Sequence, residues 1–266
     1  KIRWELKSSI RRRKVANYYD IHRTYWIDTW RVVAVSNFPY APFPMNEHGI
    51  VSGGDWDLAV IPWERFQPWL AFCHRCRDGG QWEDTEWYRT LLRKIREGRC
   101  MYGCRSREEL DAHFAATDDL IRRIACDGYR TQEELAGPRA GLKLQDEITV
   151  HIDRWGHYLL ADGRHRLCIA RLLGLERVPV KVARRHAAWV QLRRSVVSYA
   201  AANGGVAPQP LNHPDLAHIA GTDLSSTFEL VRQYLLPGGS VLDVTARWGY
   251  YCRRLEGIGL ACTALE

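Results

Sequence analysis

The spacing of apolar residues predicts helices between residue 54 and about residue 136. The apolar residues Trp87, Tyr88, Leu91, Leu92 and Ile95 recur at steps of one and three residues, which places them on one helical face. Thr85 or Asp84 can cap the start of this helix, and Gly98 its end.

A capping box, Ser106-x-x-Glu109, predicts the start of a second helix, because its two side chains satisfy N–H groups that a helix start leaves open. The apolar face behind it consists of Leu110, Phe114, Thr117, Ile121 and Ile124. We expect both helices to be scaffold and to carry no chemistry.

From residue 148 the pattern changes to a period of two. Ile148, Val150 and Ile152 alternate with polar residues, which predicts a strand with one buried face. Residues 158–161 form its expected hairpin partner. A helix at 167–173 ending at Gly174 and a third strand at 178–182 follow, so a small mixed sheet is expected here.

The remaining segments have weaker patterns. We expect a basic, proline-rich and extended lead-in at 1–53, an aromatic helical region at 54–106, a sheet domain at 107–197, a linker at 198–225 and a last segment at 226–266. In that last segment a helix, a strand, another helix and a short strand are predicted. The fold class is therefore α+β, with a helical N-terminal region packed on the mixed sheet.

Composition places the chain among globular proteins. Its 266 residues are 46% hydrophobic and 26% charged, and no apolar run approaches the roughly 20 residues of a membrane helix. No secretory signal is recognisable, so we expect a cytoplasmic protein. Residue 1 is lysine and residue 266 lies in a predicted strand, so we also expect a piece of a longer protein.

Most of the net charge of +7 comes from one end of the chain. The basic residues of the first fifty positions include the run Arg11-Arg-Arg-Lys14. Residues 1–14 could bind nucleic acid or another anionic surface, or they could form an ordinary solvated helix. The oligomeric state is left open.

The cysteines raise the question of zinc. Cys73-x-x-Cys76 and Cys100-x3-Cys104 have ligand-like spacing for a four-thiolate site. Buried thiols that act as small hydrophobes explain the same residues, and we favour that interpretation.

The segment most specific for chemistry is Asp162-Gly-Arg-His-Arg166, which joins a strand to a helix. A glycine at such a turn lets the backbone approach a ligand, and the open N–H groups at a helix start favour an anion. Arg164, His165 and Arg166 add hydrogen-bond donors. Asp162 could orient His165, hold Mg²⁺ or cap the helix. A purely structural turn with solvated side chains is the alternative.

This segment resembles the ParB/sulfiredoxin-like family. Its phosphate-binding turn is Gly-x-His-Arg or Gly-Glu-Arg-Arg, followed by a helix ending Leu-Leu-Gly-Leu and a Val-Pro-Val strand, as here. The resemblance covers about residues 107–191. It implies that Gly163, His165 and Arg166 bind the phosphates of ATP or CTP with Mg²⁺, in an NTPase or small-molecule kinase. From their own chemistry, Arg164 joins the expected phosphate-binding residues, and Asp162 with His165 are the candidate catalytic residues.

Arg164 stands where sulfiredoxins carry their reactive cysteine, so the resemblance does not extend to the reduction of sulfinic acids. Arg184, Arg185, His186 and Trp189 are expected to follow the third strand, where they could close over a nucleotide or form a solvated basic turn.

Residues 239–266 resemble the opening of a class I S-adenosylmethionine-dependent methyltransferase. The resemblance implies cofactor-binding roles for Asp243, Gly249 and Glu266, while Thr245 stands where that family has its first glycine. Two strands cannot enclose the cofactor, so we expect methyl transfer only in a longer parent protein.

Two functions from different classes remain. The first is a nucleotide-binding ParB/sulfiredoxin-like domain, from a protein that also carries the methyltransferase. The second is a non-catalytic module that binds nucleic acid or protein through the basic N-terminal arm.

Overall fold

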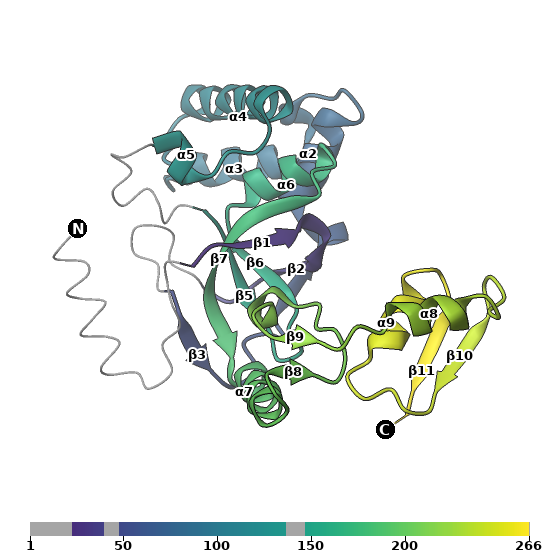
Figure 1. The fold of residues 1–266 in the computed structure, drawn as a ribbon. Coiled ribbons are helices and arrows are strands. Elements are labelled where there is room, and N and C mark those ends of the chain that lie inside the picture. Colours follow the sequence, from purple (N-terminus) through teal and green to yellow (C-terminus); the bar gives the residue numbers. More distant parts are fainter. Residues whose placement is uncertain (1–22, 40–47, 137–146, 266) are drawn as a thin grey trace. The chain divides into compact units, whose positions relative to one another are not determined.

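A computed structural model describes residues 23–39, 48–136 and 147–265. These residues form a mixed α+β fold with a seven-stranded sheet and two small parallel sheets, which confirms the predicted class. The chain divides into two compact units, residues 1–190 and 191–266. Figure 1 shows their elements.

The sheet of the first unit has the order β1-β7-β5-β6-β2-β4, and β3 pairs with β7. Its strands are β1 (Tyr25–Asp28), β2 (Val32–Ser36), β3 (Ile50–Ser52), β4 (Val60–Pro62), β5 (Ile148–Ile152), β6 (Tyr158–Asp162) and β7 (Arg177–His186). β5 and β6 are antiparallel neighbours, which confirms the predicted hairpin. β5 and β7 are parallel.

β5 differs from the prediction of a strand with one buried face. Its polar positions Thr149 and His151 are each only 1% exposed, so all five residues are buried. Apolar and polar residues do alternate along β5, but both faces of this central strand are covered. The alternation of polarity therefore does not show that the second face is buried.

Three strands come from residues 1–53, which were predicted to be an extended lead-in. β1 pairs antiparallel with β7, β2 pairs parallel with β6, and β3 pairs parallel with β7. Tyr25, Ile27, Val32 and Val35 are buried in the core. These strands are short, and the partners named here lie more than 120 positions away, so no local pattern identifies these pairings. β2 also pairs with the nearby β4.

The last residues of β7 correct a second prediction. Arg184, Arg185 and His186 lie within the strand rather than after it. Arg185 is 1% exposed and donates a hydrogen bond to the hydroxyl of Tyr25 at 2.8 Å. Arg184 donates one to Ser52 Oγ at 2.7 Å. These side chains therefore hold neighbouring strands together.

The helices of the first unit gather at one side of the sheet (Figure 1). They are α2 (Gln67–Cys76), α3 (Glu86–Arg96), α4 (Arg107–Asp127), α5 (Gln132–Ala136) and α6 (Arg164–Leu172), while α7 (Ala187–Ala202) contains the boundary between the units.

Both periodic helices are confirmed, since Trp87, Leu91, Leu110 and Phe114 are buried. Ser106 caps α4 through a hydrogen bond from Glu109 N at 3.2 Å.

A buried arginine near the end of α6 ties this helix to the segment between β1 and β2. Arg171 donates hydrogen bonds to the carbonyl oxygens of Thr29 and Val32, at distances between 2.5 and 3.1 Å. Its guanidinium lies 3.9 Å from the ring centre of Trp63 and 4.7 Å from that of Trp30.

An ion pair fixes the turn between β5 and β6. Arg154 bonds the carboxylate of Asp57 at 2.7 and 2.8 Å, and its backbone N–H donates to the same carboxylate at 3.0 Å. The Asp57 side chain is fully buried, and burial of such a charge requires this kind of pairing.

The second unit contains two parallel strand pairs. They are formed by β8 (Val206–Ala207) with β9 (Ala220–Gly221), and by β10 (Ser240–Asp243) with β11 (Ala261–Ala264). α8 (Ser225–Arg232) and α9 (Tyr250–Glu256) accompany them. Residues 203–221, part of the predicted linker, thus hold one of these pairs. Phe228, Tyr250, Leu255 and Leu260 form a small core.

None of the helices in the described ranges is long and apolar enough to cross a lipid bilayer.

Candidate functional site

The predicted turn joins the end of β6 to the start of α6. Gly163 has φ +81° and ψ 27°, in the left-handed region that glycine adopts readily. A Cβ built on Gly163 would lie 2.8 Å from the backbone Cα of Ile148 in β5. The turn therefore needs glycine for two reasons, its backbone conformation and its close approach to the neighbouring strand.

Gly163→Ala should lower the free energy of unfolding by about 2 kcal/mol, because left-handed strain adds to a contact that backbone atoms cannot relieve cheaply. Chemical denaturation measures this. Gly174→Ala is the matched control, because Gly174 also has a positive φ of +67° but nothing within 4 Å of the added Cβ. A loss no larger than that of the control would contradict the close approach.

The three side chains after Gly163 lie in different surroundings, although all of them were predicted to bind the phosphates of one nucleotide. Successive residues of an α-helix are rotated by about 100°, since a turn takes 3.6 residues. Arg164 lines a cavity beside β2 and β6, His165 enters an aromatic cluster, and Arg166 lines a second cavity beside α4.

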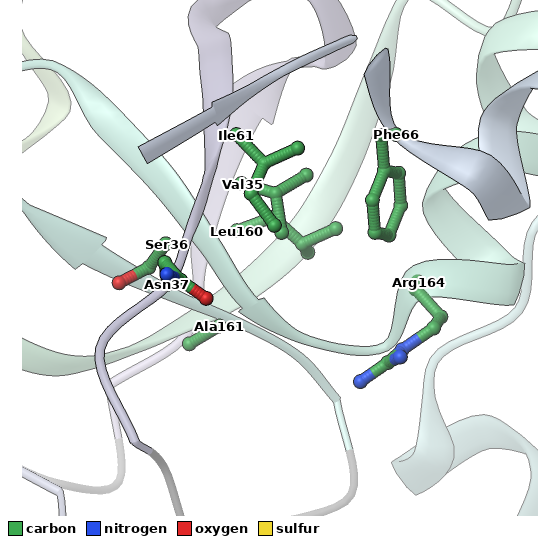
Figure 2. Close-up of a pocket in the computed structure, with 8 residues that line it drawn as sticks. All are labelled: Val35, Ser36, Asn37, Ile61, Phe66, Leu160, Ala161 and Arg164. Atoms are coloured by element: carbon green, nitrogen blue, oxygen red, sulfur yellow. The ribbon is translucent and has the colours of Figure 1, made fainter. Parts of the chain in front are cut away.

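The first cavity has a volume of about 190 Å³ (Figure 2). Val35, Ile61, Leu160 and Phe66 give it an apolar wall. The polar lining is formed by Arg164 on one side and by Ser36 and Asn37, at the end of β2, on the other. Arg164 Nη1 donates a hydrogen bond to the hydroxyl of Tyr102 at 3.1 Å.

His165 packs among aromatic rings. Its ring centre lies 5.4 Å from those of Trp87 and Tyr102, 5.5 Å from His113 and 5.8 Å from Phe72. Its Nε2 is buried and has no hydrogen-bond partner among the described residues. Burial and the neighbouring His113 lower the pKa of His165 to about 3, so the ring is neutral at pH 7. This placement is that of a packing residue, and catalysis by His165 stays a prediction.

Arg166 lies 3.8 Å from the carboxylate of Glu147, which is almost fully buried. Glu147 also accepts hydrogen bonds from Gln132 N at 2.6 Å and from the Tyr129 hydroxyl at 3.4 Å. Burial raises the pKa of Glu147 even though Arg166 lies nearby. Arg166 therefore neutralises a buried acid as well as lining the second cavity.

The second cavity, of about 230 Å³, lies between the end of α4, α5 and the start of α6. Leu120, Ile124 and Leu135 supply apolar surface, and Arg123 and Arg130 join Arg166 as cationic lining residues. Two cavities thus flank the start of α6, each with one arginine of the predicted turn.

Asp162 is the last residue of β6, and its carboxylate accepts a hydrogen bond from Gly163 N at 2.7 Å. That contact is local to the turn and is not a helix cap, because Gly163 is the N-cap residue of α6 and no described side chain caps the helix start. A role in catalysis or in holding Mg²⁺ stays a prediction.

The methyltransferase-like residues lie in the second unit. Asp243 ends β10 and accepts a hydrogen bond from Thr245 N at 3.1 Å. Gly249 precedes α9 with φ +75°. The buried side chain of Gln209 accepts hydrogen bonds from Trp248 N and Tyr250 N, so it already occupies donors of this turn. Glu266 lies outside the described residues, and binding of S-adenosylmethionine stays a prediction.

The four cysteines of the zinc alternative are free thiols that differ in exposure, from exposed Cys76 and Cys100 to buried Cys104. In the described part of the chain, no three His, Cys, Asp or Glu side chains are grouped to hold a metal ion. The basic arm, residues 1–14, lies outside the described residues.

Sequence reasoning missed four residues around the turn, which are Ser36, Asn37, Tyr102 and Glu147. The sequence does contain a signal for Ser36 and Asn37, because these two polar residues directly follow the apolar run Val32–Val35. Polar residues at a strand end are frequent in binding sites of α/β sheets. Tyr102 lies between the two cysteines of the second pair, and nothing in the local sequence distinguishes it.

Comparison with known proteins identified no matching family model, no matching curated protein and no matching solved structure.

Proposed function

We propose that the first turn of α6 binds the phosphate groups of a nucleotide, ATP or CTP with Mg²⁺, and that residues 107–197 act as a nucleotide-binding domain of the ParB/sulfiredoxin type. The observation that carries the proposal is the place of Arg164. It lies beside a glycine turn whose following N–H groups have no intrahelical acceptor, and it lines a cavity that also contains Ser36 and Asn37.

The chemistry of this cavity suits one end of a nucleotide. A guanidinium and helix N–H groups bind phosphate oxygens, and the hydroxyl and amide opposite can bond a ribose or a further phosphate. A cavity of about 150 Å³ holds a benzene molecule, so about 190 Å³ holds a phosphate group with part of a sugar but not a whole nucleotide. The rest of the ligand would extend beyond it.

The proposal also includes hydrolysis and phosphoryl transfer, for which the structure offers less support than for phosphate binding. Among the described residues, Asp162 is the only carboxylate at the turn itself, and it accepts a hydrogen bond from Gly163 N. Phosphate binding is therefore the function that the geometry supports best.

The test is titration calorimetry with ATP, CTP and ADP in the presence of Mg²⁺. Arg164→Ala should weaken binding about 100-fold, because a charge-assisted contact to phosphate contributes about 1.5–3 kcal/mol. Arg89→Ala, an exposed arginine of α3, is the control and should bind like the wild type. Adenosine should show no dependence on Arg164.

Arg164 is a better probe than Arg166. Removal of Arg166 would take away a cation that lies 3.8 Å from the buried Glu147, so lost binding could reflect a damaged fold. A wild-type chain that gives no heat with any of the three nucleotides would refute the proposed function. If Arg164→Ala still binds the nucleotide tightly, the phosphate binds outside the first cavity.

A further inference from the structure

We propose that Tyr102 is a positioning residue that holds the guanidinium of Arg164 in place for the phosphate. The inference rests on the proposed function and adds a residue to the site from a segment about 60 positions earlier in the chain. Neither the phosphate-turn pattern nor the periodicity of the helices pointed to it.

Two contacts join Tyr102 to Arg164. The tyrosine hydroxyl accepts a hydrogen bond from Arg164 Nη1 at 3.1 Å, and the guanidinium carbon lies 5.9 Å from the centre of the tyrosine ring. An arginine side chain loses much rotamer freedom when it binds a ligand. A partner that orders the guanidinium beforehand reduces this cost and so increases affinity.

The tyrosine ring is itself held on three sides. It stacks on His113 with ring centres 5.1 Å apart and planes 13° apart, and it meets Trp87 edge to face at 6.0 Å. The ring of His165 lies 5.4 Å away. The cluster that contains His165 therefore supports Tyr102, so His165 can act on the site indirectly, through packing.

The backbone at Tyr102 has an unfavourable conformation. Its φ of +54° is one of two positive values among the described non-glycine residues. Met101 and Cys104 exchange backbone hydrogen bonds of 3.0 and 2.9 Å across the turn, which holds this conformation. Such strain persists only where surrounding contacts determine it, and it is frequent at functional sites. Here the strained turn carries the side chain that contacts Arg164.

The hydroxyl also has hydrogen-bonding capacity left. Burial raises the pKa of Tyr102, although Arg164 opposes the shift, so the group is a neutral hydroxyl at pH 7. A neutral hydroxyl that accepts one bond from Arg164 keeps its own proton for donation. The bond from Arg164 therefore uses only an acceptor site of the hydroxyl.

Tyr102→Phe removes the hydroxyl and keeps the ring in its cluster. Affinity for Mg²⁺-ATP or Mg²⁺-CTP, measured by calorimetry, should fall about tenfold, as expected for the loss of a bond to a charged group. Tyr234→Phe is the matched control, because Tyr234 is 80% exposed, and it should leave affinity unchanged. Thermal unfolding of both variants checks that the fold is intact.

The decisive comparison is a double-mutant cycle. If Tyr102 acts through Arg164, Tyr102→Phe should cause no further loss in an Arg164→Ala background. Additive losses, or wild-type affinity in Tyr102→Phe, would overturn the positioning role while leaving the proposed function standing. Absence of nucleotide binding by the wild-type chain would refute the proposed function and the positioning role with it.

A readout without nucleotide completes the test. The ionisation of Tyr102, followed by NMR of ¹³Cζ-labelled tyrosine, should shift to higher pH in Arg164→Ala, because Arg164 lowers the tyrosine pKa. An unchanged titration would show that the two side chains do not interact in solution and would overturn the inference directly.

Discussion

Asp57→Ala should lower the free energy of unfolding by about 3–4 kcal/mol, the largest effect that we expect for a single substitution in this chain. The Asp57 carboxylate is fully buried and binds both the side chain and the backbone N–H of Arg154. It also lies 3.9 Å from His186 Nε2. Removing one partner of a buried ion pair leaves the other charge poorly compensated, which commonly costs about 3–5 kcal/mol. Arg154 keeps some access to water, so a value toward the lower end of that range is expected.

Asp55→Ala provides the control. Asp55 bonds the same guanidinium at 2.7 Å, but its side chain is 78% exposed. Exposed ion pairs contribute at most about 1 kcal/mol. Urea denaturation of the two variants separates the effect of burial from that of charge, and equal losses would show that the burial of Asp57 is unimportant.

The same carboxylate should make stability depend on pH. Burial acts to raise the pKa of Asp57, but the hydrogen bonds from Arg154 outweigh it and hold the pKa below its ordinary value of 3.8. The folded state therefore binds this proton less readily than the unfolded chain does. The contribution of Asp57 is present above the ordinary value and is lost as pH falls through the lower, folded value. Asp57→Ala should remove this part of the acid sensitivity.

The second large effect is expected for Arg171→Ala, at about 3 kcal/mol. Arg171 is 4% exposed, satisfies the carbonyl groups of Thr29 and Val32, and lies between the rings of Trp30 and Trp63. Hydrogen bonds to a charged group contribute about 1.5–3 kcal/mol, and a desolvated cation–π contact adds up to about 2 kcal/mol. Loss of the side chain also leaves a cavity.

Arg177→Ala is a suitable comparison, because the exposed Arg177 donates a hydrogen bond to a single backbone carbonyl, that of Trp26. We expect a loss below about 1 kcal/mol in chemical denaturation. Arg171→Lys should recover only part of the stability, since an ammonium cannot reproduce the planar fork of donors. Full recovery by lysine would indicate that charge alone matters at this position.

The parts of the fold that the sequence predicted are those whose causes are local. Helix α4 follows from its capping serine and its apolar period, and the hairpin β5–β6 with α6 follows from alternation, a glycine turn and an apolar helix. Strands β1, β2 and β3 have three to five residues each, and their place in the sheet depends on partners far along the chain. The strand propensity of a short segment does not specify which distant strand it pairs with.

The candidate site shows the same division. Gly163 was recognisable because its role is a property of the turn, and Arg164 because it follows that turn. The separation of Arg164, His165 and Arg166 into three surroundings depends on what packs against α6. Tyr102 reaches the site only through tertiary packing.

The pairing of β1 with β7 also has a consequence for biosynthesis. Asp28 and Arg177 are register partners, so about 150 residues must be translated before β1 can meet its neighbour in the sheet. At roughly 5–20 residues per second this takes on the order of 10 s. Until then the apolar residues of β1 have no β7 to pair with on the nascent chain, so we expect this segment to be exposed to intermolecular contacts during synthesis.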